Sequence, residues 1–262
     1  MSDAERSTVA PGRDAVLALT GERTVPGIPE ENYWFRRHEV AYLRLQHHCA
    51  GARVLEAGCG EGYGAALLAG SARQVIGLDY DAITAGHVAA RYPEVRVVRG
   101  NLAHLPLPDG AVDVVANLQV IEHLWDQAGF LLECIRVLRP GGLLLLSTPN
   151  RITFSPGRDT PINPFHTREL AGSELTQLLE EAGFRVRELL GVHHGPALRE
   201  LDAAHGGSLI EAQVAVALSG GQWPDRLRAD VAQVAASDFE IHGDRIDDSL
   251  DLVAVAQRPE AS

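Results

Sequence analysis

Residues 54–64 read VLEAGCGEGYG, and this stretch decides the fold. A short apolar strand at 53–57 runs directly into a turn in which every second residue is glycine, and a helix is predicted at 63–69. Glycines let a chain turn sharply from strand to helix and bring its backbone close to a ligand. The N–H groups at the start of the helix can donate to polar ligand atoms. We therefore expect a strand–turn–helix unit with a ligand at the turn.

Apolar strand-like segments alternate with helical segments on both sides of this turn. Such alternation predicts an α/β fold with a mostly parallel sheet and helices on both faces. Helices are expected at 63–69, 81–91, 126–138 and 171–182. The predicted sheet has seven strands, at 53–57, 74–79, 95–99, 112–117, 143–148, 184–192 and 251–258.

Three segments lie outside this alternation within a chain of 262 residues, a length that suits one large α/β domain. We expect a loose tail at 1–22 and a single domain at 23–262. In this fold, ligands bind at the carboxyl ends of the strands. The three segments are an amphipathic cap helix at 28–46, a polar active-site loop at 149–168 and a helical insert at 196–245 before the last strand. We expect them to cover that edge and to determine substrate specificity.

Bulk composition excludes several classes of function. The net charge of −12 argues against a nucleic-acid partner, which would require clustered Lys and Arg. Three cysteines, Cys49, Cys59 and Cys134, fit neither a disulfide framework nor a zinc site, so a cytoplasmic location is expected. The N-terminus lacks a signal pattern, and no apolar run approaches the roughly 20 residues that span a bilayer, so no membrane insertion is expected.

The glycine spacing distinguishes between cofactors. A nicotinamide fingerprint requires Gly-x-Gly-x-x-Gly, but counting from Gly58 the last position is Tyr63. The stretch instead resembles motif I of the Rossmann-like class I S-adenosylmethionine (SAM)-dependent methyltransferases, which carry an acidic residue two positions before the first glycine. Here that residue is Glu56. The resemblance implies that its carboxylate fixes the loop and the amino-acid end of SAM.

The same resemblance, over about residues 50–192, implies further contacts with SAM and its product, S-adenosylhomocysteine. Asp79 ends the second strand, where the family holds both ribose hydroxyls, and Tyr80 lies where a side chain often rests against adenine. Asn101 replaces an aspartate that contacts the adenine amino group in many relatives. The full implied set is Glu56, Gly58, Gly60, Gly62, Asp79, Tyr80, Asn101, Leu102, Asn117 and Gln119.

Two histidines are candidates for the catalytic base. Transfer to a hydroxyl requires a group to take its proton, and a neutral histidine suits that role near pH 7. His123 follows the fourth strand and His166 follows the fifth, so both are expected at the active edge. Two structural alternatives stay open: His123 packs a helix start, or His166 holds its loop by hydrogen bonds.

No metal site is expected from the sequence. Glu122 and Asp126 are one helical turn apart and have the oxygen ligands that divalent cations favour. First-turn carboxylates are also favoured by the helix dipole, and this second interpretation is preferred. His193 and His194 are interpreted as structural or substrate-lining residues rather than as ligands.

Four stretches carry a closer resemblance, to an actinobacterial group of methyltransferases encoded among genes for methylglucose lipopolysaccharide. They are residues 21–42, 120–127, 147–170 and 245–256. The resemblance implies methyl transfer to a sugar hydroxyl of an oligosaccharide or glucan. Two alternatives remain open: an O-methyltransferase for a small aromatic or lipid-linked acceptor, and a non-catalytic SAM-binding protein.

Overall fold

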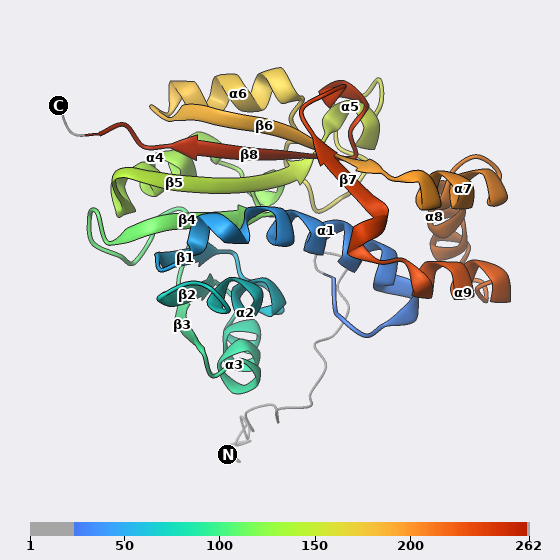
Figure 1. The fold of residues 1–262 in the computed structure, drawn as a ribbon, viewed down its shortest axis with the longest axis horizontal. Helices are drawn as coiled ribbons and strands as arrows, with labels where there is room; N and C mark the ends of the chain where they lie inside the picture. Colours follow the sequence, from blue (N-terminus) through green and yellow to red (C-terminus); the bar gives the residue numbers. More distant parts are fainter. Residues whose placement is uncertain (1–23, 261–262) are drawn as a thin grey trace, which may run out of the picture.

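A computed structural model describes residues 24–260, so the predicted tail at 1–22 lies outside the described residues. The described chain forms one sheet in the order β3-β2-β1-β4-β5-β8-β6-β7 (Figure 1). The prediction of seven strands is wrong, because the sheet has eight. The strands are β1 (Arg53–Ala57), β2 (Gln74–Asp79), β3 (Val95–Arg99), β4 (Val112–Leu118), β5 (Leu138–Pro149), β6 (Arg185–His194), β7 (Phe239–His242) and β8 (Asp251–Gln257).

The sheet is mostly parallel, as expected. Strands β1 to β5 pair in parallel, β8 lies antiparallel between β5 and β6, and β7 pairs antiparallel with β6. The chain order reverses between β1 and β4, which makes their carboxyl ends the topological switch point where such sheets bind ligands. The extra strand β7 lies inside the insert predicted to be helical, and four residues are too few to show a reliable period of two.

Helices cover both faces of the sheet, and two buried apolar clusters fill the space beneath them. On β1, Val54 points into one cluster and Leu55 into the other, as the alternation of side chains along a strand requires. The helices are α1 (Asn32–Leu45), α2 (Tyr63–Ala69), α3 (Ala82–Arg91), α4 (Gln127–Val137), α5 (Arg151–Phe154), α6 (Gly172–Glu181), α7 (Pro196–Ala204), α8 (Leu209–Ser219) and α9 (Asp225–Gln233).

Helices α7, α8 and α9 gather beyond one end of the sheet, close to the start of α1 (Figure 1). The Asn32 side chain joins α1 to this group by donating to the backbone carbonyls of Val231 and Val234, at 3.0 and 2.8 Å. A buried ion pair joins α1 to β8: Arg37 donates to both carboxylate oxygens of Asp251, each at 2.6 Å. The cap helix and the insert are thereby fixed to the carboxyl edge.

The predicted loop at 149–168 contains one short helix, α5, and is held at both ends. Asn150 donates to the carbonyls of Ile246 and Ser249, both at 3.0 Å, and pairs with Leu170 in a parallel bridge. These bonds place the rest of the loop over the ends of β4 and β5. Among the described residues, no helix is long and apolar enough to cross a membrane.

Candidate active site

The glycine turn after β1 bends back over the end of β2. The N–H groups of Gly58 and Cys59 both donate to the carbonyl of Leu78, at 2.9 Å. Gly58 has a φ of +89°, and a Cβ atom there would lie 2.7 Å from the Val120 side chain. Only glycine combines this left-handed conformation with such a close approach. The turn therefore brings its backbone against the segment that follows β4.

The Asp79 carboxylate is fastened to this turn. It accepts from the Gly60 N–H through one oxygen and from the Asp81 N–H through the other, both at 3.0 Å. Two backbone donors thus hold both oxygens of this carboxylate in a fixed orientation. It is therefore positioned as an acceptor for hydroxyl groups of a bound ligand.

A cavity of about 450 Å³ opens at this edge, within the range of about 300–1,000 Å³ usual for small-molecule sites. Seven of the ten predicted cofactor residues line it, and they come from the ends of four neighbouring strands. Their binding role stays a prediction, but the fold brings them together as the motif implied. These seven are Gly58, Gly60, Asp79, Tyr80, Asn101, Leu102 and Gln119.

The other three residues support the cavity from behind. Glu56 is buried and accepts from the Tyr42 hydroxyl at 2.7 Å, and burial raises its pKa to about 8. Asn117 is also buried and donates to the carbonyl of Ala57 at 2.7 Å, which ties β4 to β1. A Cβ atom on Gly62 would lie 2.9 Å from Val88, so this glycine allows α2 and α3 to pack. These three residues therefore make structural contacts behind the cavity and do not line it.

Gln119 lies at the boundary of the cavity in a strained backbone conformation, with a φ of +57°. Its N–H donates to the carbonyl of Ser147 at 2.8 Å, which holds the strain in place. Non-glycine residues in this region of φ cluster at functional sites. The strained conformation follows the end of β4, and Val120, Glu122 and His123 beyond it line the cavities.

A second cavity, of about 310 Å³, adjoins the first. The two cavities share Thr24, His38, Gln119 and His123. The remaining lining of the second cavity mixes apolar and polar side chains. The apolar residues are Trp34, Pro149, Phe154 and Val214, and the charged or polar ones are Glu31, Arg37, Glu122, Asn163, His166 and Asp251.

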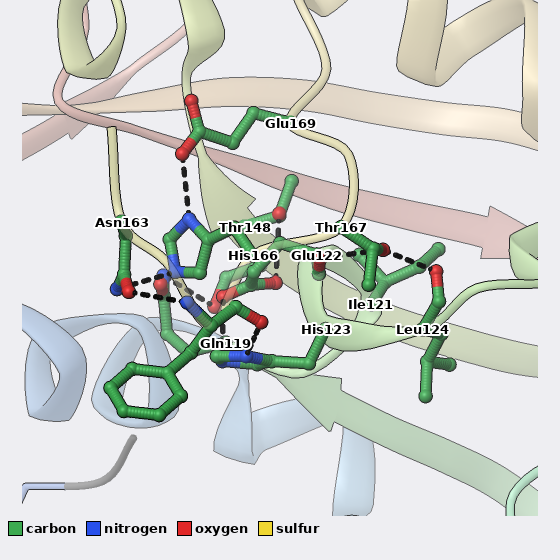
Figure 2. A network of polar contacts seen from close by, with 12 residues as sticks. Gln119, Ile121, Glu122, His123, Leu124, Thr148, Asn163, His166, Thr167 and Glu169 are labelled. Carbon is green, nitrogen blue, oxygen red and sulfur yellow. Dashed lines mark hydrogen bonds and ion pairs between the residues drawn. The ribbon is translucent and has the colours of Figure 1, made fainter. Parts of the chain in front are cut away.

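The loop carrying His166 is tied to the turn carrying His123. The Thr167 N–H donates to the carbonyl of Glu122 at 2.7 Å, and its hydroxyl donates to the carbonyl of Leu124 at 2.6 Å (Figure 2). The two imidazole rings consequently lie with their centroids 4.9 Å apart. Both histidines therefore occur at one site, as their positions after β4 and β5 predicted.

Hydrogen bonds fix the orientation and protonation of both rings. His166 Nδ1 lies 2.6 Å from a carboxylate oxygen of Glu169, which can only accept, so Nδ1 carries the proton (Figure 2). Its Nε2 then accepts from the side-chain amide of Asn163 at 3.0 Å. His123 Nδ1 donates to the carbonyl of Phe165 at 3.0 Å. Each ring thus donates from Nδ1, and Nε2 of His166 faces a donor.

Glu122 is buried beside these rings. One carboxylate oxygen accepts from the Thr148 hydroxyl at 2.9 Å, and the other lies 4.0 Å from His123 Nε2. Burial raises the pKa of Glu122 to about 8. Asp126 does not join it, because its carboxylate caps α4 by accepting from the Gly129 N–H at 2.8 Å. The structural interpretation of Asp126 is confirmed, whereas Glu122 faces the second cavity.

His38 was not predicted, yet it lines both cavities. Burial lowers its pKa to about 4, so the ring is neutral near pH 7. Its only signal in the sequence is its position one helical turn after Trp34, which lines the second cavity. Tyr33 is instead fully buried, and its hydroxyl lies 2.6 Å from Nε2 of His194. His194 is therefore structural, as one of its two interpretations proposed.

Comparisons with known proteins agree with this geometry. A family model described as "Methyltransferase domain" matches residues 55–146. A probable SAM-dependent methyltransferase of Mycolicibacterium smegmatis is 68% identical, covering 94% of this chain and 96% of its own. One of Mycobacterium tuberculosis is 62% identical, covering 97% and 93%.

The fold also resembles the solved structure of the [4+2]-cyclase SpnF, with a TM-score of 0.59 and 20% identity over 86% of this chain and 81% of that one. That level of identity concerns the fold alone. The relatives, by contrast, match along nearly the whole length of both chains. The chain therefore belongs to the SAM-dependent methyltransferases, and SAM is its cofactor.

Proposed function

We propose that the chain methylates a sugar hydroxyl of an oligosaccharide or glucan of the methylglucose lipopolysaccharide type. The observation that carries this proposal is the second cavity, whose lining includes charged and polar side chains and which adjoins the cofactor cavity at His123. The actinobacterial sequence resemblance and the two mycobacterial relatives support the class of acceptor. The acceptor hydroxyl would enter from the second cavity and meet the methyl group where the cavities join.

The first cavity has the groups that SAM requires. The fixed Asp79 carboxylate suits the two ribose hydroxyls, and the open space beside Gly60 leaves room for a ligand against the turn. Bound SAM supplies an activated methyl group, which passes to the acceptor oxygen as the carbon–sulfur bond breaks and its electrons return to sulfur. The protein must therefore align the acceptor and receive one proton.

His166 and His123 are the residues that we assign to the acceptor hydroxyl. His166 resembles a general base in its arrangement, because a buried carboxylate, Glu169, holds the proton on Nδ1 and leaves the lone pair on Nε2. His123 lies at the boundary shared by the two cavities. In this assignment the hydroxyl would replace the Asn163 amide at Nε2 of His166.

The second cavity offers a polyol hydrogen-bonding groups and a stacking face. Glu31, Asn163 and His166 line it, and Trp34 adds an aromatic face on which a sugar ring can stack. Pockets for aromatic ligands are lined mainly by apolar side chains with few polar groups. A polyhydroxylated acceptor uses such donors and acceptors more fully.

Radiolabelled SAM tests the proposal when it is incubated with oligoglucosides, free phenols and quinone precursors. We expect label in the oligosaccharides and a turnover number at least about 100-fold lower in His166→Ala, the usual contribution of an acid–base residue. The His104→Ala variant is the matched control, because this side chain is 87% exposed. Label in phenols alone would contradict the sugar acceptor. SAM binding without transfer to any acceptor would favour a non-catalytic protein.

A further inference from the structure

We infer that Glu122, His123 and His166 form a binding site for one divalent transition-metal cation. A carboxylate oxygen and two imidazole nitrogens, one from each residue, all lie within 4.8 Å of one another. Metal–ligand bonds to such atoms measure about 2.0–2.2 Å, so small side-chain rotations would bring all three to one cation. No metal site was predicted from the sequence, because Glu122 and Asp126 were interpreted as first-turn carboxylates favoured by the helix dipole. His166 approaches Glu122 only in the folded protein.

Each of the three residues has a partner that orients it as a ligand. Glu169 holds Nδ1 of His166 at 2.6 Å, and the carbonyl of Phe165 holds Nδ1 of His123 at 3.0 Å (Figure 2). Thr148 holds the far oxygen of Glu122 at 2.9 Å. Metal-binding histidines usually donate their second ring N–H to a carboxylate or carbonyl in this way. A cation would take the lone pair of His166 that Asn163 now contacts.

The charge balance of the cluster also favours a cation. Glu122 and Glu169 are 1% and 3% exposed. Within residues 24–260, no arginine pairs with either carboxyl group; the basic groups beside them are His123 Nε2, 4.0 Å from Glu122, and His166 Nδ1, 2.6 Å from Glu169. An ionised carboxylate is costly to bury unless it is paired or binds a metal. A divalent ion bound to Glu122 would offset this cost.

Two imidazoles and one carboxylate select for the class of cation. Imidazole suits zinc, copper, iron and nickel, whereas magnesium, calcium and manganese prefer carboxylate, carbonyl and water oxygens. Three protein ligands also leave coordination positions open for an oxygen of a small molecule. The open positions would face the second cavity, which all three ligands line.

The consequence for catalysis rests on the proposed function. A hydroxyl oxygen bound to the cation would become more acidic and lose its proton to water as the carbon–oxygen bond forms. The histidines would then act as ligands, not as direct bases. The site itself does not depend on this step, so its binding can be tested separately from activity.

Cobalt(II) is the probe, added to chelator-treated protein, because its visible spectrum reports its coordination geometry. We expect one equivalent to bind with intensified absorption in the wild type. Glu122→Gln and His166→Ala should abolish the bands, and Glu169→Gln should weaken the affinity about 10–100-fold, as the loss of an orienting partner does. His104→Ala, which changes an exposed histidine, should leave both the bands and the affinity unchanged.

Absence of binding to the folded wild type would overturn the inference, and so would binding that persists in both Glu122→Gln and His166→Ala. Circular dichroism establishes that each variant is folded, and His166→Gln provides a second substitution at that ligand. Failure of the inference is distinguishable from failure of the proposed function. Protein that methylates a glucan but binds no cobalt would keep the function and reject the metal site. Cobalt bound at the cluster without glucan methylation would do the reverse.

Discussion

The two cavities at the carboxyl edge are built in different ways. The wall of the cofactor cavity comes mainly from consecutive strand ends between residues 58 and 124, and its main fastening bond, Gly60 to Asp79, spans 19 residues. The second cavity, which is the proposed acceptor cavity, combines residues of α1, the loop after β5, α8 and β8. Its ion pair of Arg37 with Asp251 spans 214 residues.

The cofactor cavity therefore depends mainly on backbone conformation, and the acceptor cavity depends mainly on buried side-chain pairs. Glycine conformations and strand ends position Asp79 and Gly60, so substitutions there should act on SAM binding. Buried side-chain pairs hold the acceptor cavity together, so substitutions there should act on stability or turnover while SAM binding persists. The four variants that follow probe this separation.

The largest effect is expected for Arg37→Ala. Removing one partner of a buried ion pair leaves Asp251 unpaired, which typically costs about 3–5 kcal/mol of the free energy of unfolding. Urea denaturation measures this loss. The double variant Arg37→Met with Asp251→Leu is the matched control and should regain most of it, because apolar replacements of both partners are often neutral. A single variant as stable as the wild type would contradict the account.

Gly58→Ala should damage the cofactor cavity selectively. The added methyl group meets Val120 at a left-handed φ, so we expect a cost of about 1–3 kcal/mol and SAM affinity at least about tenfold weaker. Isothermal titration calorimetry measures the affinity. The Gly110→Ala control also has a positive φ, but it lies outside the cavity, and its SAM affinity should be unchanged. Equal losses in both variants would indicate a general effect on folding.

Glu56→Gln should change how stability depends on pH. The folded-state pKa of Glu56, about 8, lies above the ordinary value of 4.5, so the folded protein retains a proton that the unfolded chain releases. Stability from this group is complete below pH 4.5 and is lost as the pH rises to 8. The variant lacks that loss, so it should gain on the wild type by more than about 1 kcal/mol between pH 5 and pH 8. Denaturation of SAM-free protein at both pH values would show a constant difference if this interpretation is wrong.

Tyr80→Ala should have the smallest effect. The side chain is 72% exposed at the mouth of the cofactor cavity, so its loss should change the free energy of unfolding by less than about 0.5 kcal/mol. Loss of an aromatic contact with adenine should weaken SAM binding by about 0.5–1.5 kcal/mol. Unchanged affinity would remove Tyr80 from the binding surface, and Tyr80→Phe should retain full affinity.

The sequence predicted the strands that are long enough to show a pattern within their own residues. Seven of the eight strands were expected, and β7 was missed because its four residues lie among helical segments. Seven residues of the glycine turn and the following strand ends line the cofactor cavity as implied. Features that depend on backbone conformation, such as this turn, can be recognised from short motifs in the sequence.

The acceptor cavity was harder to predict because its contacts join distant parts of the chain. His38 carries no motif, and its role appears only when α1 packs over the strand ends. The approach of Glu122 to His166 depends on Thr167, which bonds the loop to the carbonyls of the preceding turn. Glu56 and Asn117 belong to the implied set, yet they brace the site from within the core.

The separate roles of the two cavities are tested most directly by calorimetric titration with SAM. The wild type, Asp79→Ala and His166→Ala are titrated, and turnover is measured on the same preparations. We predict that Asp79→Ala loses SAM binding, whereas His166→Ala binds SAM like the wild type and loses turnover. Wild-type SAM affinity in Asp79→Ala would contradict the assigned cofactor site. Equal loss of SAM binding in both variants would contradict the separation of the two cavities.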